Sequence, residues 1–183
     1  MTRAPAYNSL ARSGSRDTSH LWNYPCSLYN RSLESLTGQQ VQEDAHKSFM
    51  LNSQAAESGM KDAVLAMGWF YLNGVGVEQD VEQARRWYRK SARQGDSRAM
   101  FSLGQMAFDE QDFADARVWF RRASDKGHAR SLFWLGKLYW RGYGVPEDRK
   151  QAMALFQKAA ASKVPEARRV LGFLSRKSRQ SQR

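Results

Sequence analysis

The sequence contains little cysteine and no long hydrophobic run. Cys26 is the single cysteine, so no disulfide can form within the chain, which favours a reducing compartment. No segment reaches the roughly 18 consecutive apolar residues of a membrane-spanning helix. Residues 1–22 lack the apolar core of a secretory signal, and we favour a disordered tail there over an organelle presequence. We therefore expect a cytoplasmic protein.

Patterns typical of catalysis, metal binding and cofactor binding are also missing. The three histidines, His20, His46 and His128, do not have the spacing of metal ligands. The segments NGVGV (73–77) and RGYGV (141–145) lack the Lys-Ser/Thr end of a phosphate loop, and their glycines need only a turn. No Ser-x-x-Lys with a matching base is present. We expect no enzymatic activity, no metal and no cofactor.

An internal repeat organises the chain. A hydrophobic residue followed by glycine recurs at intervals of 36, 32 and 36 residues, and several other columns keep the same register. The pairs are Met67-Gly68, Leu103-Gly104, Leu135-Gly136 and Leu171-Gly172. The other columns are Ala63, Ala99, Ser131 and Ala167; Asp80, Asp112 and Asp148; Ala84, Ala116 and Ala152; and Trp87, Trp119 and Leu155.

Residues 59–94 show what one repeat contains. An amphipathic segment ends near Leu72, where Asn73, Gly74 and Gly76 favour a turn. A second amphipathic segment begins at Asp80, whose carboxylate can cap the first turn of a helix. Each repeat is therefore predicted to be a pair of helices, and the carboxylates that recur with it are predicted to be caps and turn residues.

The recurring columns suggest how the helices pack. A glycine inside a helix costs about 1 kcal/mol relative to alanine, so its recurrence implies a close approach of the second helix. We expect the Ala84, Ala116 and Ala152 column to meet these glycines. The column of Trp87, Trp119 and Leu155, with the aromatic residue that follows each, is expected to fill the space between successive pairs.

The register divides the chain into a tail, repeats and a closing helix. The tail is residues 1–22, a degenerate repeat covers 23–58, and further repeats cover 59–94, 95–126 and 127–162; a closing helix at 164–177 and a disordered basic end at 178–183 follow. The degenerate repeat rests on Gly38 and Val41–Asp44, which align with Gly74 and Val77–Asp80. The repeat at 95–126 is four residues shorter because FDEQD replaces the glycine-rich turn.

The repeats resemble a known family. AVLAMGWFYLNGVGVEQDVEQARRWYRKSA from Ala63 and SLFWLGKLYWRGYGVPEDRKQAMALFQKAA from Ser131 are similar to the Sel-one-like (Sel1) repeat, a relative of the tetratricopeptide repeat. The likeness covers residues 59–174 well and 23–58 weakly. It implies an all-α fold, a right-handed α/α superhelical solenoid whose first helices line a concave face. It also implies an adaptor or scaffold that assembles other proteins, often in bacteria.

The first helix of each repeat carries a stripe at helical spacing that, by this resemblance, lines the concave groove. We predict that a partner peptide or helix, possibly acidic, binds there, and that the protein is a monomer. Leu65, Phe101 and Phe133 could instead be core residues between successive first helices. The predicted groove residues are Leu65, Trp69, Leu72, Phe101, Gln105, Phe108, Arg130, Phe133, Lys137, Trp140, Arg169 and Phe173.

The uneven charge leaves an alternative function. The net charge is +11, and residues 163–183 contain seven basic residues and one acidic residue. This basic C-terminal third could bind nucleic acid or an anionic surface, with a strong dependence on salt. Many of the arginines lie at exposed positions of second helices, where charge is ordinary, so we rank this alternative below the protein-binding groove.

Overall fold

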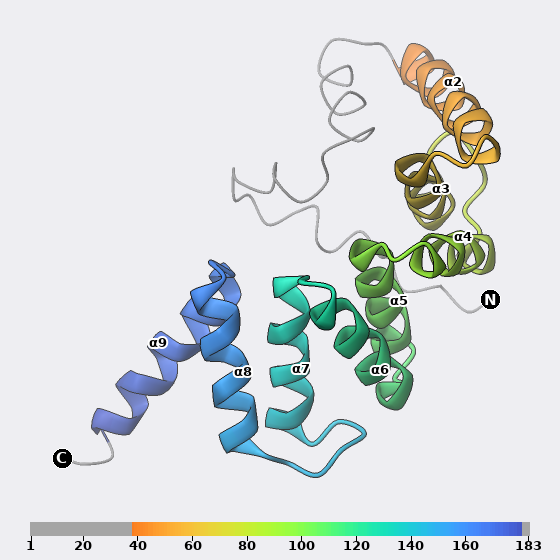
Figure 1. Ribbon diagram of the computed structural model, residues 1–183. Helices are drawn as coiled ribbons and strands as arrows, with labels where there is room; N and C mark the ends of the chain where they lie inside the picture. Colours follow the sequence, from red (N-terminus) through yellow and green to blue (C-terminus); the bar gives the residue numbers. More distant parts are fainter. Residues whose placement is uncertain (1–37, 181–183) are drawn as a thin grey trace, which may run out of the picture. The chain divides into compact units, whose positions relative to one another are not determined.

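The computed structural model describes residues 38–180, and this part of the chain is entirely helical (Figure 1). Its eight helices are α2 (Gly38–Glu57), α3 (Lys61–Asn73), α4 (Val81–Arg93), α5 (Ser97–Asp109), α6 (Phe113–Asp125), α7 (Ala129–Arg141), α8 (Arg149–Ala161) and α9 (Pro165–Gln180). They form two compact units, Met1–Trp87 and Tyr88–Arg183. The predictions for the tail, for Cys26 and His20, for residues 23–37 and for the last three residues lie outside the described part.

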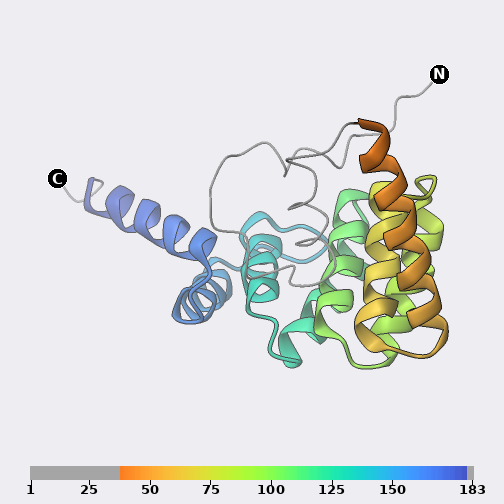
Figure 2. The same cartoon turned by 90° about the horizontal axis from the view of Figure 1, so that it is seen from above.

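The first unit is built on the pairing of α2 with α3, which lie side by side in both views (Figures 1 and 2). The buried face of α3 includes Val64, Met67 and Phe70, each almost fully enclosed. The Phe49 ring of α2 meets the Phe70 ring edge to face at 5.9 Å between centroids. These contacts bury the apolar face that the sequence pattern of α3 predicts.

Helix α2 begins earlier than the repeat register suggests. Residues 38–44 align with the turn at 74–80, yet they continue the helix without interruption. The physical reason is local composition. Residues 38–44 contain a single glycine, Gly38. The residues after it are mostly Gln, Val and Glu, which do not break a helix.

The turn after α3 does more than reverse the chain, which corrects the expectation that its glycines need only a turn. Gly74 and Gly76 both have positive φ, 66° and 68°. A Cβ added to Gly76 would lie 2.2 Å from the carbonyl oxygen of Ala45 in α2. The imidazole Nδ1 of His46 also lies 3.0 Å from the Gly76 carbonyl oxygen. Glycine is required here because the turn packs directly on the preceding second helix.

The glycine-rich turn of the second unit makes the equivalent contact. A Cβ added to Gly144 would lie 2.9 Å from Cβ of Phe113, the first residue of α6. The Tyr143 ring stacks on the Phe113 ring at 4.7 Å between centroids. Phe113 and Ala45 occupy the same column, since each directly follows the recurring aspartate. Because this contact recurs, it gives a physical reason why residues 38–58 still align, although weakly, with the later repeats.

Glycines within the first helices receive aromatic rings. A Cβ on Gly104 of α5 would lie 2.6 Å from the Phe120 ring of α6, and a Cβ on Gly136 of α7 would lie 2.6 Å from the Phe156 ring of α8. The expected close approach is present, and the Ala152 carbonyl oxygen of the alanine column lies 3.3 Å from the Cβ position at Gly136. The aromatic ring that fills each notch was not predicted from the sequence.

The last repeat glycine has a different environment. A Cβ added to Gly172 in α9 would meet nothing within 4 Å. On its inner side α9 is held by Val164 and Ala167, which pack with Ala159 of α8. The glycine at 172 therefore keeps the repeat pattern without any packing requirement among the described residues.

Recurring aspartates cap the second helices as predicted. The carboxylate of Asp80 accepts a hydrogen bond from the Gln83 N–H at 2.9 Å. Asp112 accepts one from the Asp115 N–H at 3.0 Å, and Asp148 accepts one from the Gln151 N–H at 2.8 Å. Each bond satisfies an amide that the first turn of a helix leaves free. These carboxylates therefore have a structural role.

Candidate functional site

The predicted groove residues divide between the two units. Leu65, Trp69 and Leu72 lie half-buried on α3 in the first unit. The Trp69 ring packs edge to face on the Phe70 ring at 5.5 Å, which anchors the indole on the core of that unit. The remaining nine residues lie on α5, α7 and α9 of the second unit, and the site is described there.

Phe101 belongs to the core. Its side chain is only 5% exposed, and its ring lies 5.8 Å from that of Phe120 and 4.5 Å from that of His128. A partner could not reach it without opening the unit. The core role that the sequence left open for Phe101 is the one the structure supports.

Phe108 and Lys137 meet in one aromatic cluster on α5 and α7. The Lys137 ammonium lies 4.7 Å from the Phe108 ring centroid and 4.4 Å from the Trp134 ring centroid. Burial lowers the pKa of Lys137, and the positive charge of Arg141 lowers it further, whereas the negative charge of Asp109 acts in the opposite direction. Burial likewise raises the pKa of Asp109, against Lys137. A partly desolvated cation over two rings gives this surface both charge and aromatic character.

The sequence analysis missed the central member of this cluster. Trp134 stacks on Phe120 at 5.6 Å and meets Phe108 edge to face at 4.9 Å. Its column holds the small residues Ala66 and Ser102 in earlier repeats, so a tryptophan there was an available signal. Trp134 belongs to the repeat at 127–162, which comes directly after the repeat with the shortened turn.

On α7 and α9 the predicted stripe is continuous. The Arg130 guanidinium lies 2.9 Å from a carboxylate oxygen of Glu166, which ties the same column of the two helices together. Further along α7, Phe133 and Trp140 both rest on Phe156, with ring centroids 5.7 Å and 6.2 Å away. These two aromatic residues keep part of their surface in solvent.

Helix α9 presents its stripe openly. Phe173 is 60% exposed, and Arg169 is exposed as well. The side chains of Gln105, Phe108, Arg130, Phe133, Lys137, Trp140, Arg169 and Phe173 therefore form an accessible or partly accessible surface on the first helices, which we call the first-helix surface.

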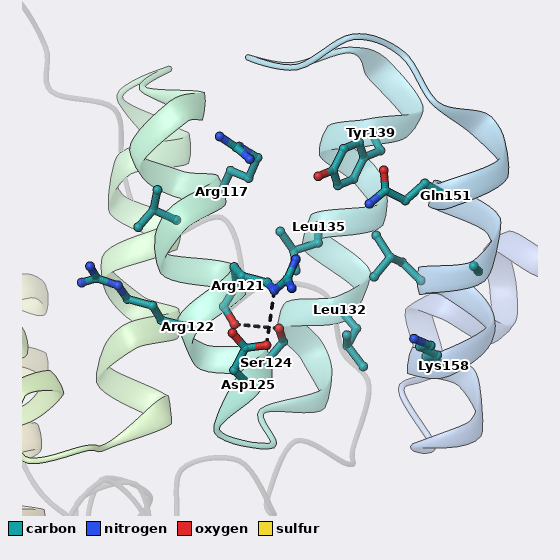
Figure 3. Close-up of a pocket in the computed structure, with 13 residues that line it drawn as sticks. Arg117, Arg121, Arg122, Ser124, Asp125, Leu132, Leu135, Tyr139, Gln151 and Lys158 are labelled. Atoms are coloured by element: carbon teal, nitrogen blue, oxygen red, sulfur yellow. Dashed lines mark hydrogen bonds and ion pairs between the residues drawn. The ribbon is translucent and has the colours of Figure 1, made fainter.

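The second unit also contains a hollow of about 520 Å³ that is lined by residues of α6, α7 and α8. Figure 3 shows α6 forming one wall, α8 the other and α7 the floor. The floor is mostly apolar, with Leu132, Leu135 and the ring of Tyr139, and Leu155 contributes from α8. Leu155 thus borders an open space, which corrects the expectation that its column fills the gap between helix pairs.

The hollow is rich in positive charge. Arg117, Arg121, Arg122 and Lys158 line it together with a single carboxylate, Asp125. Arg121 pairs with Asp125 at 3.3 Å, whereas Arg122 lies over the Trp119 ring at 5.0 Å and is directed away from α7 (Figure 3). Arg121 and Arg122 are among the second-helix arginines that were interpreted from the sequence as ordinary surface charge.

Candidate chemistry elsewhere is limited. Within residues 38–180, no three His, Cys, Asp or Glu side chains gather as metal ligands would. His128 is held between Phe101 and Ser131, and burial, helped by the charge of Arg130, lowers its pKa from 6.5 to about 4. Among the described helices, none has both the length and the apolar character needed to cross a bilayer.

Comparison with known proteins gives the repeat a family. The sequence profile of the Sel1 repeat matches four segments, residues 27–60, 61–96, 97–128 and 129–163. The structure is also similar to that of a Sel1 repeat protein from Oxalobacter formigenes, with a TM-score of 0.69 and 26% identity over 80% of this chain and 59% of the other. These similarities show an all-α helical repeat solenoid related to the tetratricopeptide fold.

Curated relatives are regulators. The chain is 33% identical over 61 residues to the chitin synthase regulator SKT5 of Malassezia restricta, covering 33% of this chain and 4% of the other. It is 28% identical over 109 residues to an exopolysaccharide production negative regulator of Rhizobium leguminosarum bv. viciae, covering 57% and 41%. The chain therefore spans less than half the length of these relatives.

Proposed function

This chain belongs to the Sel1 repeat family, and we propose that it is a non-catalytic scaffold that binds a segment of another protein on its first-helix surface. Repeats of this family are associated with protein interaction, and two matched relatives are named as regulators. The observation that carries the proposal is the combination on α7 of half-buried Phe133 and Trp140 with the cations Arg130 and Lys137. Aromatic and arginine side chains of this kind dominate the binding energy of protein interfaces.

Preorganisation is the proposed mechanism. Phe133 and Trp140 are braced by the buried ring of Phe156, and Arg130 is held by Glu166. Side chains fixed before binding lose little entropy when a partner arrives. The partner is proposed to be a peptide or helix with apolar anchors and acidic residues, which complement Arg169 and Lys137. The protein is proposed to act as a cytoplasmic monomer.

Photo-crosslinking tests this proposal with a matched pair of positions. Gln105 lies half-buried on the first-helix surface, whereas Gln157 is exposed on the second helix α8 and does not line the hollow. A photoreactive amino acid would replace each glutamine in turn, and the full chain would be irradiated in nuclease-treated lysate of its source organism. We expect one protein to crosslink at position 105 and not at 157.

A second variant asks whether the same surface supplies affinity. Arg169→Ala with Phe173→Ala removes two exposed side chains of α9, so the fold should be kept. The captured protein, purified, should bind this variant at least about tenfold more weakly. Equal crosslinking at positions 105 and 157, or unchanged affinity, would contradict the proposal. Capture at position 105 that occurs in untreated lysate but is lost in nuclease-treated lysate would instead favour the electrostatic alternative.

A further inference from the structure

We propose that the hollow between α6 and α8 is a second binding site, which accepts an extended peptide segment of a partner protein with alternating acidic and apolar residues. The site lies on the second helices and on the floor helix α7, so it shares no residue with the first-helix surface.

The dimensions favour an extended segment. On α6 the lining runs from Arg117 to Asp125, which is about 12 Å at 1.5 Å per residue. Four residues of extended chain, at about 3.3 Å each, have a similar length. A helix of the same 12 Å length, with a diameter of about 10 Å including side chains, would need roughly 900 Å³. The hollow has a volume of about 520 Å³, within the usual range of binding sites.

The α6 wall supplies matched positive charges. Arg117 and Arg121 are four residues apart, so their positions differ by about 6 Å along the helix. Side chains at i and i+2 of an extended peptide are about 6.6 Å apart and point the same way. Two acidic residues at this spacing can therefore face the two arginines. Arginine suits this role because its guanidinium binds a carboxylate through two parallel hydrogen bonds.

Both arginines can accept a new partner. Within residues 38–180 no ion pair holds Arg117. Arg121 is paired with Asp125, but the two side chains are 69% and 63% exposed, and such surface pairs are weak. Lys158 adds a further positive charge on the α8 wall. The four cations and one carboxylate of the lining leave a net charge that attracts an acidic segment.

The opposite side of the hollow suits apolar side chains. Leu132 and Leu135 form the floor on α7 (Figure 3), and Leu155 of α8 lines the hollow as well. In an extended peptide the residues between the two acidic ones point to the opposite side. They would contact these leucines while the acidic residues face α6. An alternating sequence such as Asp-Leu-Asp-Leu satisfies both walls at once, whereas a bare phosphate chain leaves the apolar floor uncovered.

Fluorescence anisotropy with the full chain tests the site. The probe is a fluorescein-labelled peptide, Gly-Asp-Leu-Asp-Leu-Gly amide, and the control peptide has the order Asp-Asp-Leu-Leu with the same composition. One protein variant is Arg117→Glu with Arg121→Glu. Its matched control is Arg89→Glu with Arg93→Glu, two exposed arginines with the same spacing on α4 that do not line the hollow.

A second variant separates the hollow from general electrostatic attraction. Ala154 is exposed and lines the hollow, so Ala154→Trp fills the space without changing the charge. We expect the alternating peptide to bind at least tenfold more weakly to both the Ala154→Trp and the Arg117/Arg121 variants. The Arg89/Arg93 variant should bind as the unsubstituted chain does. Circular dichroism of each variant checks that helicity is unchanged.

Several results would overturn the inference. One is binding that is unaffected by Ala154→Trp, and another is equal weakening by the two double charge reversals. Equal affinity for the two peptide orders, or no binding of either at millimolar concentration, would also refute it. Displacement of the peptide by single-stranded DNA from all variants alike would assign the charge to nucleic-acid attraction. The substitutions in the hollow do not change Gln105 or α9, so these outcomes do not affect the test of the first-helix surface.

Discussion

Replacing the repeat glycines one at a time tests the packing of the helix pairs. Gly104, Gly136 and Gly172 occupy the same column, and only the first two have a ring against them. In an open helix position, glycine to alanine is stabilising because the flexible backbone of glycine loses more entropy on folding. Where a ring fills the notch, the added methyl group has to displace it. The same substitution should therefore have opposite effects at equivalent positions.

The distances set the magnitudes. Gly172→Ala should stabilise α9 by about 1 kcal/mol, since its Cβ meets nothing within 4 Å. Gly136→Ala gains the same amount but pushes on the Phe156 ring at 2.6 Å and on the Ala152 carbonyl oxygen at 3.3 Å. Overpacking of this kind costs about 1–3 kcal/mol, so the net loss is roughly 0–2 kcal/mol. Gly104→Ala should be milder, because the three atoms closest to its Cβ position all belong to the side chain of Phe120 and none is a backbone atom.

Thermal unfolding followed by circular dichroism compares the three variants. At about 2–4 °C per kcal/mol for a chain of this size, the Tm values of Gly172→Ala and Gly136→Ala should differ by roughly 2–12 °C. Hydrogen exchange of α9 amides adds a local measurement, because repeat proteins do not always unfold in one step. If Gly136→Ala raised the Tm as much as Gly172→Ala, the close ring contact would not explain the glycine column.

Three further predictions follow from individual side chains. Ser91 is fully buried, and its hydroxyl has no hydrogen-bond partner among the described residues. The equivalent positions of the other repeats hold Ala55, Ala123 and Ala159. Ser91→Ala should therefore raise the free energy of unfolding, measured by urea titration, by about 1 kcal/mol; a lower free energy of unfolding would show that the hydroxyl makes a stabilising hydrogen bond. Gly76→Ala should destabilise the first unit by about 2 kcal/mol or more, because Gly76 has a positive φ and its added Cβ would lie 2.2 Å from the Ala45 carbonyl oxygen. It should also speed hydrogen exchange in α2 more than the control Gly74→Ala does, since the atom closest to the Cβ position of Gly74 is a side-chain carbon at 3.1 Å. Burial lowers the pKa of His128 from 6.5 to about 4, so the unfolded chain binds this proton first and stability should fall as pH drops from 6.5 to 4. Urea unfolding at pH 7 and 4.5 should show a smaller drop for His128→Asn, which removes the titrating ring and leaves a polar side chain at the start of α7; an equal drop would assign the effect to other groups.

The repeat pattern made much of the architecture readable in advance. Aspartates at fixed positions, a glycine-rich turn and apolar residues at helical spacing predict helix pairs, since each feature acts within a few residues of itself. The caps of Asp80, Asp112 and Asp148 are confirmed for this reason. The stripe on α7 was likewise predictable, because the spacing of Arg130, Phe133, Lys137 and Trp140 follows from the helix alone.

Other features depend on which residues of different repeats meet. Helix spacing places Phe101 and Phe108 in one stripe, yet the first is sealed between Phe120 and His128 and the second stays half-buried under Lys137. The role of Trp134 depends on aromatic partners from neighbouring helices, as does the contact of Gly144 with Phe113. None of these contacts joins residues that are close in sequence.

The sequence by itself thus determined the family, the helical repeat and the caps of the second helices at Asp80, Asp112 and Asp148, because these depend on local backbone preferences and on a period that the chain repeats. The tertiary structure decided which side of each helix is covered, and it alone revealed the hollow between α6 and α8. This open space lies where α6 and α8 stand apart above α7, although α7 packs on both of them. The distance between helix surfaces depends on the rings packed elsewhere between them, such as Phe120, Trp134 and Phe156, and no single repeat specifies that distance.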